Sequence, residues 1–252
     1  QAVEMLYRVD ARLEELYAVG RQLPSPYDLV LVADHGHVDA VPLETKFGTR
    51  LRPHLMEGPV PPLGEALERA LLDGRAPLVE GGGRPALERD PEVVESGNFA
   101  HIYLSRAAEP LEARQILVRH REVLSRASHS PALGLVALRR GNSAVALIQG
   151  NAYGPHELDA APLSSAFSKR AVADLLQELP QMPTAGDLVL YGEAVGQGAT
   201  VGFAWEFGSH GGLTREETDS WVCWPADAPL DLSAIGHATQ LHRRLATLYR
   251  AG

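Results

Sequence analysis

The start of the chain carries apolar residues at every third or fourth position. These are Val3, Leu6, Val9, Leu13, Leu16 and Tyr17, with charged residues between them. Because an α-helix turns once every 3.6 residues, this spacing places the apolar side chains on one face. The pattern predicts an amphipathic helix that begins almost at the first residue, and we expect further residues of the same fold upstream of Gln1.

An apolar run follows at residues 27–33, after a turn that contains Gly and Pro. Its Leu and Val residues are typical of a buried strand, and it ends at the polar sequence Asp34-His35-Gly36-His37. A helix, a turn and a buried strand in this order are typical of α/β folds. Ligands of such folds bind in the crevice beyond the carboxyl ends of the strands, so the position of Asp34 and His35 is informative.

The rest of the chain continues the alternation of strands and helices. The pattern predicts strands near 98–104, 187–191, 201–205 and 220–224, helices over about 110–127 and 164–179, and a hairpin of 133–138 with 144–149. Residues 38–96 are rich in Pro and Gly, and we expect them to form an irregular excursion with one helix at 64–72. One α/β domain over residues 1–252 is the simplest organisation.

Composition and charge narrow the possible functions. The chain has 252 residues, of which 45% are hydrophobic, and a net charge of −9. An acidic chain lacks the clustered Lys and Arg that displace counterions from nucleic acid, so we expect no nucleic-acid partner. No stretch approaches the roughly 20 uninterrupted apolar residues of a membrane helix. We therefore expect a soluble chain without a transmembrane segment, and the sequence leaves its cellular location open.

Two short polar clusters stand out, Asp34-His35-Gly36-His37 and Ser209-His210-Gly211-Gly212, and each follows an apolar run. Carboxylate and imidazole are normal ligands of Zn²⁺ and similar ions, and adjacent glycines let the backbone and a substrate approach closely. Asp34, His35 and His210 are therefore candidate metal ligands, and because each lies beyond an apolar run we expect them to converge at one edge of the sheet. The alternative is that Asp34 caps a turn beside a partly exposed His35, and that His210 is an ordinary loop residue.

These clusters resemble motifs of the alkaline phosphatase superfamily. Residues 27–36, which end in Asp34-His35-Gly36, resemble the Asp-His-Gly motif of its type I phosphodiesterase and nucleotide pyrophosphatase branch, and Ser209-His210-Gly211-Gly212 resembles the later histidine motif. Residues 97–104 resemble a strand of bacterial members. The resemblance implies an alkaline-phosphatase-like α/β sheet with helices on both faces.

The resemblance also implies an activity and cofactors. Enzymes of this branch hydrolyse phosphoesters with two divalent ions, usually zinc, and a Thr or Ser nucleophile. By resemblance, Asp34 and His35 bind the ion beside the nucleophile, and His210 binds the ion that activates water. The family's nucleophile, its first metal-binding Asp and its Asp-x-x-x-His ligand pair precede the Asp-His-Gly strand and have no counterpart before Asp34. We therefore expect the C-terminal portion of such a domain, inactive alone, with the nucleophile in a missing N-terminal segment.

Three further residues are weaker candidates. Asn98 and His101 lie on a predicted strand near the crevice and are expected to touch the substrate phosphate, while His37 is expected to support the metal ligands from behind. Two other functions stay open. A non-catalytic binding or scaffold relative keeps the fold without the metals, and a sulfatase or phosphomutase of the superfamily shares the ligands but differs in chemistry.

Overall fold

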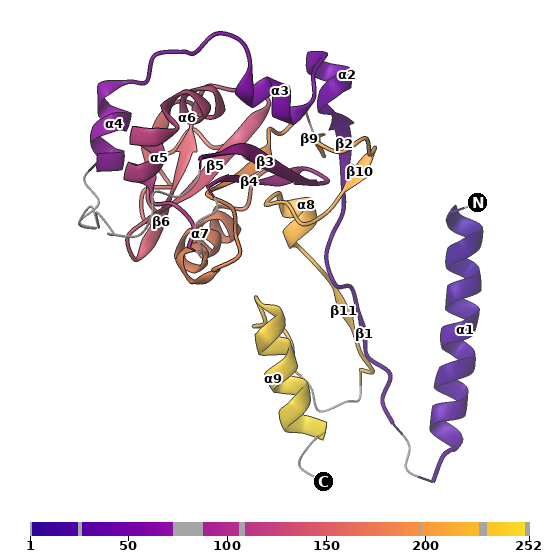
Figure 1. Ribbon diagram of the computed structural model, residues 1–252. Coiled ribbons are helices and arrows are strands. Elements are labelled where there is room, and N and C mark those ends of the chain that lie inside the picture. Colours follow the sequence, from indigo (N-terminus) through magenta and orange to yellow (C-terminus); the bar gives the residue numbers. More distant parts are fainter. Residues whose placement is uncertain are drawn as a thin grey trace. The chain divides into compact units, whose positions relative to one another are not determined.

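The computed structural model describes residues 2–24, 27–72, 88–105, 109–196, 198–226 and 231–249, and it divides into two compact units. The first unit comprises Gln1–Ala33 and Trp221–Gly252, and the second comprises Asp34–Ser220. All of the candidate site residues belong to the second unit. Figure 1 shows the elements of both.

The first unit contains two helices and a short antiparallel ladder. The helices are α1 (Ala2–Gln22) and α9 (Ala238–Tyr249), and β1 (Leu31–Val32) pairs with β11 (Val222–Cys223). Helix α1 confirms the expected N-terminal helix, and most of its apolar side chains are exposed, including Leu6 at 68%. The hydroxyl of Tyr249 donates a hydrogen bond to Asp28 Oδ2 at 2.8 Å.

The expectation of a buried strand at residues 27–33 is wrong. Only Leu31 and Val32 form strand, because the ladder with β11 is two residues long. Within the described residues no second strand pairs with the other edge of β1, and Val32 remains 48% exposed. An apolar run indicates that burial is favourable, but burial requires a covering layer, and the described part of this unit supplies none at Val32.

The second unit is built around a six-stranded sheet in the order β3-β4-β8-β5-β6-β7. Its strands are β3 (Glu88–Ser96), β4 (Phe99–Ser105), β5 (Leu133–Arg140), β6 (Ser143–Ile148), β7 (Asn151–Tyr153) and β8 (Leu188–Gly192). Strand β3 contains a register irregularity between Glu88 and Glu92. Strands β4, β5, β8 and the hairpin of β5 with β6 confirm the sequence prediction at 98–104, 133–149 and 187–191.

All neighbouring strands of this sheet are antiparallel. The expected crevice beyond the carboxyl ends of parallel strands is therefore absent from the main sheet as described. For the pairs of consecutive strands the reason is the shortness of the connections, because Gly97-Asn98 and Gly141-Asn142 join such strands through tight turns. Such turns can join only antiparallel strands, whereas parallel strands need a crossover of a dozen residues or more.

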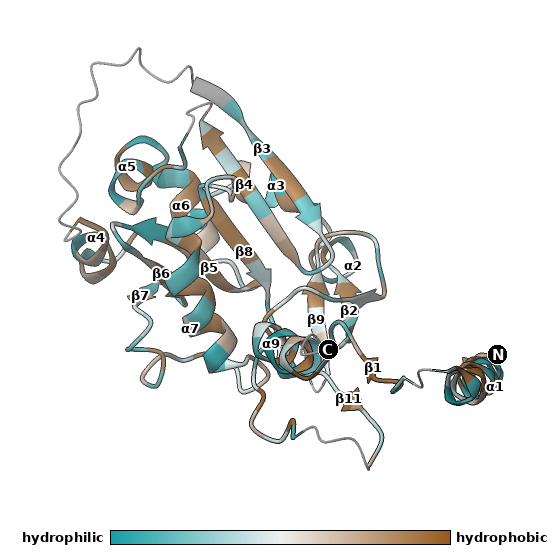
Figure 2. Ribbon diagram, turned by 90° about the horizontal axis from the view of Figure 1, so that it is seen from below, coloured by the Kyte–Doolittle hydropathy of each residue, from teal (hydrophilic) through white to brown (hydrophobic). Residues whose placement is uncertain are grey.

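Helices cover both faces of the sheet, so the second unit is a mixed α/β structure. Helices α3 (Leu51–Met56), α4 (Glu65–Leu72), α5 (Ala113–Arg119) and α6 (Arg121–Ser128) pack on one face, and α7 (Lys169–Glu178) with the 3-10 turn Leu179–Gln181 packs on the other. Successive side chains of a strand point to opposite faces, so Leu188 and Leu190 enter one core and Val189 and Tyr191 the other. Figure 2 shows these strands as largely apolar.

Two helix predictions need correction. The helix expected at 110–127 is two helices, α5 and α6, because His120 has φ −130° and ψ 37° and interrupts the helical backbone. The helix expected from 164 begins at Lys169, where the side chain of Ser168 accepts a hydrogen bond from the Ala171 amide at 3.3 Å. Ser168 is therefore the N-cap of this helix.

The segment 38–96 is more regular than its Pro and Gly content indicated. Its described part contains β2 (Val38–Pro42), α2 (Leu43–Phe47), α3, α4 and β3, so the prediction of an irregular excursion is wrong there. Leu51, Leu55, Leu67 and Leu71 are fully or almost fully buried. They belong to the same core as the strands, and this apolar contact orders the segment despite its turns. The predicted helix at 64–72 is confirmed as α4.

A small sheet completes the second unit and carries the candidate site. Strand β2 lies between β10 (Gly208–Ser209), with which it is antiparallel, and β9 (Ala199–Gly202), with which it is parallel. A short helix, α8 (Arg215–Thr218), follows β10. Strand β9 lies in the predicted region 201–205, but it begins at Ala199 and ends at Gly202.

Candidate functional site

The two polar clusters meet at the small sheet. Strand β10 pairs with β2 so that Ser209 lies opposite Val38, which brings the residue after β10 and the residue before β2 to the same end (Figure 1). The ring centroids of His37 and His210 are 6.5 Å apart. The sequence predicted that His35 and His210 converge, and they do. The expected reason was wrong, because the pairing of β2 with β10, and not a strand edge of the main sheet, brings them together.

His35 and His210 form a stacked pair of rings. Their centroids are 4.1 Å apart and their planes differ by 17°. The His35 ring also lies beside Asp34, whose Oδ1 accepts a hydrogen bond from the His35 amide at 3.0 Å. Three residues from two segments far apart in the sequence therefore share one small surface of the molecule.

The contacts of His35 determine which ring nitrogen is available. Its Nδ1 lies 2.7 Å from the carbonyl oxygen of Gly36, which only accepts hydrogen bonds, so Nδ1 carries the proton. In the neutral ring, Nε2 then has a free lone pair, and it lies 3.5 Å from Asp34 Oδ2. The side chain of His35 is 39% exposed and that of Asp34 is 88% exposed, so both are accessible from solvent.

The separation of Asp34 Oδ2 and His35 Nε2 fits two ligands of one zinc ion. Bonds near 2.05 Å in tetrahedral geometry put two ligand atoms about 3.4 Å apart. The observed 3.5 Å is close to that value. Among the described residues, however, no group of three or more His, Cys, Asp or Glu side chains is arranged to hold an ion. The pair therefore has the geometry of part of a coordination sphere.

Gly36 holds the turn that carries His35 against α8. Its amide donates a hydrogen bond to the carbonyl oxygen of Glu217 at 3.0 Å. A Cβ atom at position 36 would lie 1.8 Å from the carbonyl oxygen of Glu216. Any other residue would push this turn and α8 apart. The sequence indicated that such a glycine allows close approach, and here the group that approaches is the protein's own backbone.

A buried polar network supports the loop that carries His210. The Ser209 hydroxyl donates to Asn98 Oδ1 at 3.1 Å and accepts from the backbone amide of Asn98 at 2.9 Å. The Asn98 side-chain amide donates to Thr200 Oγ1 at 2.9 Å and to Glu217 Oε1 at 3.0 Å. Asn98 is 2% exposed, so its side chain has internal partners and little access to solvent. Its position fits the support of the His210 loop better than the substrate contact predicted from sequence.

Glu217 is the centre of this network. Its side chain is 3% exposed, and its two oxygens accept four hydrogen bonds. The donors are the Asn98 side-chain amide, the Gly212 and Thr214 backbone amides and the Thr214 hydroxyl. Burial, reinforced by the negative charge of Glu217, raises the pKa of Tyr191. Glu217 therefore connects the turn between β3 and β4, the start of α8 and Gly212 after His210.

Sequence reasoning missed Glu217, although a signal was present. Thr214 and Glu217 have the spacing of a capping box, in which each side chain bonds to the backbone of the other residue. The structure contains both bonds of that box at the start of α8. The pattern would have predicted a helix start just after His210, but it does not indicate that the carboxylate is buried.

His37 and His101 are the two other histidines that the sequence indicated as candidates. The His37 ring packs against Gly208, where a Cβ atom would lie 2.3 Å from its Cε1, and this position beside His210 is compatible with the predicted supporting role. His101, on β4, accepts a hydrogen bond from the Gly186 amide at 3.0 Å. Burial and then the charge of Arg139 lower the pKa of His101. Its nearest ring neighbours are Phe99 and Tyr103.

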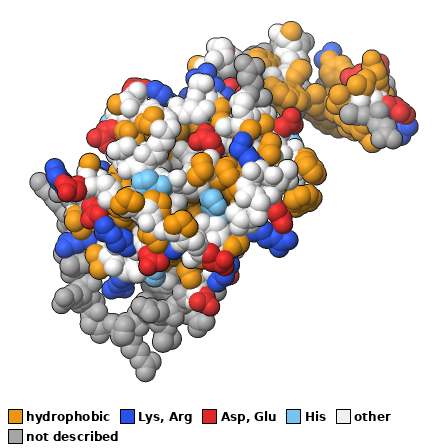
Figure 3. Space-filling model, turned by 90° about the horizontal axis from the view of Figure 1, so that it is seen from above, with side chains coloured by type: hydrophobic (Ala, Val, Ile, Leu, Met, Phe, Trp, Pro, Cys, Tyr) orange, Lys and Arg blue, Asp and Glu red, His pale blue; other side chains and the backbone are white. Residues whose placement is uncertain are grey.

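On the face shown in Figure 3, the acidic and basic side chains of the described residues are interspersed. No described helix has the length and apolar character needed to cross a membrane. No protein-family model, curated protein or solved structure matches this chain. The function must therefore be inferred from the site itself.

Proposed function

We propose that this chain contributes metal ligands to a metal-dependent phosphoester hydrolase of the alkaline phosphatase superfamily, in its phosphodiesterase and nucleotide pyrophosphatase branch. The observation that carries the proposal is the convergence of the Asp34-His35 pair with His210. Asp34 Oδ2 and His35 Nε2 are separated as two zinc ligands are, and the His210 ring stacks on His35.

The stacked rings support a site for two ions. In two-metal sites the ions lie about 3.5–4 Å apart. Two nearly parallel imidazoles with centroids 4.1 Å apart match that spacing, with one ring for each ion. Asp34 and His35 would hold the first ion and His210 the second. Such ions, when bound, polarise the phosphoryl oxygens and stabilise the charge that develops on them.

In this proposal the residues of this chain bind and orient the two ions, but they do not complete the site. Asp34 and His35 give one ion two protein ligands, and His210 gives the other ion one, whereas catalytic zinc sites have three protein ligands and a water. By the same resemblance, the further ligands and the Thr or Ser nucleophile would come from a segment outside these 252 residues. The proposed substrate is a small-molecule phosphoester.

Zinc titration is the direct test of the metal site. We expect this chain to bind zinc weakly, because each ion has at most two protein ligands, and we expect the His35→Ala variant to lose that binding. Calorimetry on the wild type, on His35→Ala and on Asp34→Asn measures the effect. His156→Ala is the matched control, because His156 is an exposed histidine in a turn of the same unit and should leave the titration unchanged.

A phosphonate probe distinguishes a hydrolase site from a plain metal site. With zinc present, we expect phenylphosphonate, a non-hydrolysable mimic of a phosphoester, to bind and to tighten zinc binding, since its oxygens can complete the coordination. His210→Ala should reduce this coupling. Zinc binding that is the same in His35→Ala would contradict the ligand assignment. An absence of zinc binding would favour a non-catalytic scaffold instead.

A further inference from the structure

A pocket lies on the face of the main sheet that α3, α4, α5 and α6 cover. It is an open hollow of about 480 Å³ beside α3, the loop after α3 and the turn after α6. Much of its wall consists of the rings of Pro53, Pro59, Pro61 and Pro131. Pockets for small molecules typically enclose about 300–1,000 Å³ and are mainly apolar with a few convergent polar groups. This pocket has the size and the apolar walls of such a site.

The pocket contains a serine and a histidine in direct contact. His54 Nε2 lies 2.7 Å from Ser130 Oγ, although the two residues are 76 positions apart in the chain. Ser130 Oγ also accepts a hydrogen bond from the Ala132 amide at 3.2 Å. With the His54 proton on Nδ1, the Ser130 hydroxyl donates to Nε2. This is the arrangement of a nucleophile with its general base.

The environment of His54 favours its neutral form. The side chain is half-buried between α3 and the turn after α6, and burial lowers the pKa of His54. Other charged and titratable groups of the pocket are Arg126, His129 and Glu57. A neutral imidazole has a free lone pair on Nε2 near neutral pH and can take the proton of the serine hydroxyl.

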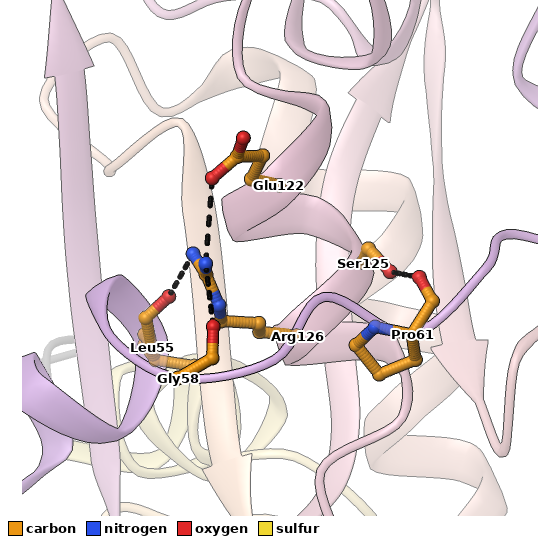
Figure 4. Close-up of polar contacts among 6 residues, drawn as sticks. All are labelled: Leu55, Gly58, Pro61, Glu122, Ser125 and Arg126. Atoms are coloured by element: carbon orange, nitrogen blue, oxygen red, sulfur yellow. Dashed lines mark hydrogen bonds and ion pairs between the residues drawn. The ribbon is translucent and has the colours of Figure 1, made fainter.

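Arg126 places a fixed positive charge in the same pocket. Its side chain is 10% exposed and extends from α6 toward α3, where its Nη atoms donate to the carbonyl oxygens of Leu55 at 3.4 Å and Gly58 at 3.0 Å (Figure 4). Glu122 pairs with it at 3.3 Å. Its Nε is buried and has no hydrogen-bond partner among the residues that the structure describes. Because Arg126 lines the pocket, its charge lies beside any bound molecule and favours negative charge that develops there.

We propose that Ser130 and His54 form a hydrolytic site for small esters with an apolar group, distinct from the candidate metal site. Ser130 Oγ bonds to the ester carbonyl carbon while its proton passes to His54 Nε2. The bond from that carbon to the alcohol oxygen then breaks, and the leaving alcohol takes the proton from Nε2. A water molecule attacks the acyl-serine, gives a proton to Nε2, and the acid departs as Ser130 Oγ regains that proton.

The proline rings bind the apolar group, and Arg126 stabilises the carbonyl oxygen.

Covalent labelling tests this site directly. An alkyl fluorophosphonate reacts with an activated serine, which displaces fluoride and keeps the phosphonyl group. We expect intact-mass spectrometry to show one adduct per chain and peptide mapping to place it on Ser130. Ser130→Ala should remove the adduct, whereas Ser143→Ala, at a partly exposed serine of the β5–β6 hairpin, should keep it.

The role of His54 separates catalysis from a purely structural hydrogen bond. His54→Gln keeps a hydrogen-bonding side chain but no base, so labelling of Ser130 and hydrolysis of p-nitrophenyl butyrate should both slow by about 100-fold or more. His156→Gln, at an exposed histidine that does not line the pocket, is the matched control and should keep both rates. Circular dichroism shows which variants are folded.

Three results would overturn the proposal: no adduct on wild-type Ser130, equal labelling rates in wild type and His54→Gln, or p-nitrophenyl butyrate hydrolysis that zinc chelation abolishes. Each would leave Ser130 and His54 as a structural link between α3 and the turn after α6. If Ser130→Ala does not fold, the peptide map of the wild type and the His54→Gln rates still decide. Retention of ester hydrolysis by His35→Ala would show that the two sites act separately.

Discussion

Replacing Glu217 with alanine is expected to lower the free energy of unfolding by about 3–5 kcal/mol. The buried carboxylate accepts four hydrogen bonds, and its removal leaves four donors in a water-poor environment with a cavity beside them. Each unsatisfied buried donor costs about 1–3 kcal/mol, although such costs do not add fully. Urea unfolding followed by circular dichroism measures the change.

The neighbouring residue provides a matched control. Glu216 lies on the same short helix, carries the same side chain and is exposed, so Glu216→Ala should change the free energy of unfolding by no more than about 0.5 kcal/mol. Glu217→Gln should have an intermediate effect. The glutamine side chain keeps one acceptor oxygen, but its NH2 group is itself a donor and would face donors that the carboxylate now binds. If Glu217→Ala were as stable as Glu216→Ala, the buried network would not have the importance assigned to it.

The Gly36→Ala variant is expected to lose both stability and zinc binding. The added Cβ would lie 1.8 Å from the Glu216 carbonyl oxygen and 2.9 Å from that of Asp219. These are backbone atoms that cannot rotate away, so the turn carrying His35 must move from α8. Overpacking of this kind costs about 1–3 kcal/mol and sometimes more. The movement would also separate His35 from His210, and weaker zinc binding in calorimetry would report it.

A glycine with free space around it is the control for this substitution. A Cβ atom added at Gly64, just before α4, would meet no heavy atom of a non-adjacent residue within 4 Å, and the φ of Gly64 lies outside the left-handed region. Gly64→Ala should therefore cost at most about 1 kcal/mol, mainly from its position at the helix start, and should leave zinc binding unchanged. Wild-type zinc affinity in Gly36→Ala would show that the 34–37 turn does not depend on its contact with α8.

Local sequence patterns predicted much of the second unit. The hairpin of β5 with β6 was predictable because a Gly-Asn turn separates two apolar runs, and β4 and β8 because their residues are rich in Leu, Ile, Val and Tyr. The same reasoning failed at β2 and β10. A strand of two residues, Gly208–Ser209, carries no periodic signal, and its pairing with Val38–Asp39 depends on a partner that lies far away in the chain.

Burial of polar residues was the least predictable part of the site. Glu216 and Glu217 are adjacent and identical, yet the first is exposed and the second is 3% exposed. The capping-box spacing from Thr214 distinguishes Glu217 from Glu216, but the burial of its carboxylate also depends on the tertiary position of Asn98. For the same reason the sequence indicated that Asn98 was polar and close to the site, but could not separate a side chain that faces a substrate from one that holds a loop.

The convergence of Asp34, His35 and His210 was predictable, because two metal-type clusters in one chain are informative together. The position of the 27–33 run was not. Its apolar residues indicate that it favours contact with other apolar groups, but they do not say which surface provides that contact. Tyr27 at 59% exposure and Val32 at 48% show how far the observed environment departs from the expected one.

The ends of the six-stranded sheet bear on how the protein behaves at high concentration. Outer strands present unpaired backbone groups to which a strand of another molecule can add, and such addition leads to aggregation. Strand β3 has Pro91, which lacks an amide hydrogen, an irregular register near Glu92 and a further charge at Glu95. The opposite outer strand, β7, is three residues long. Both outer strands are therefore poor templates for intermolecular β-pairing, which favours solubility of the folded second unit.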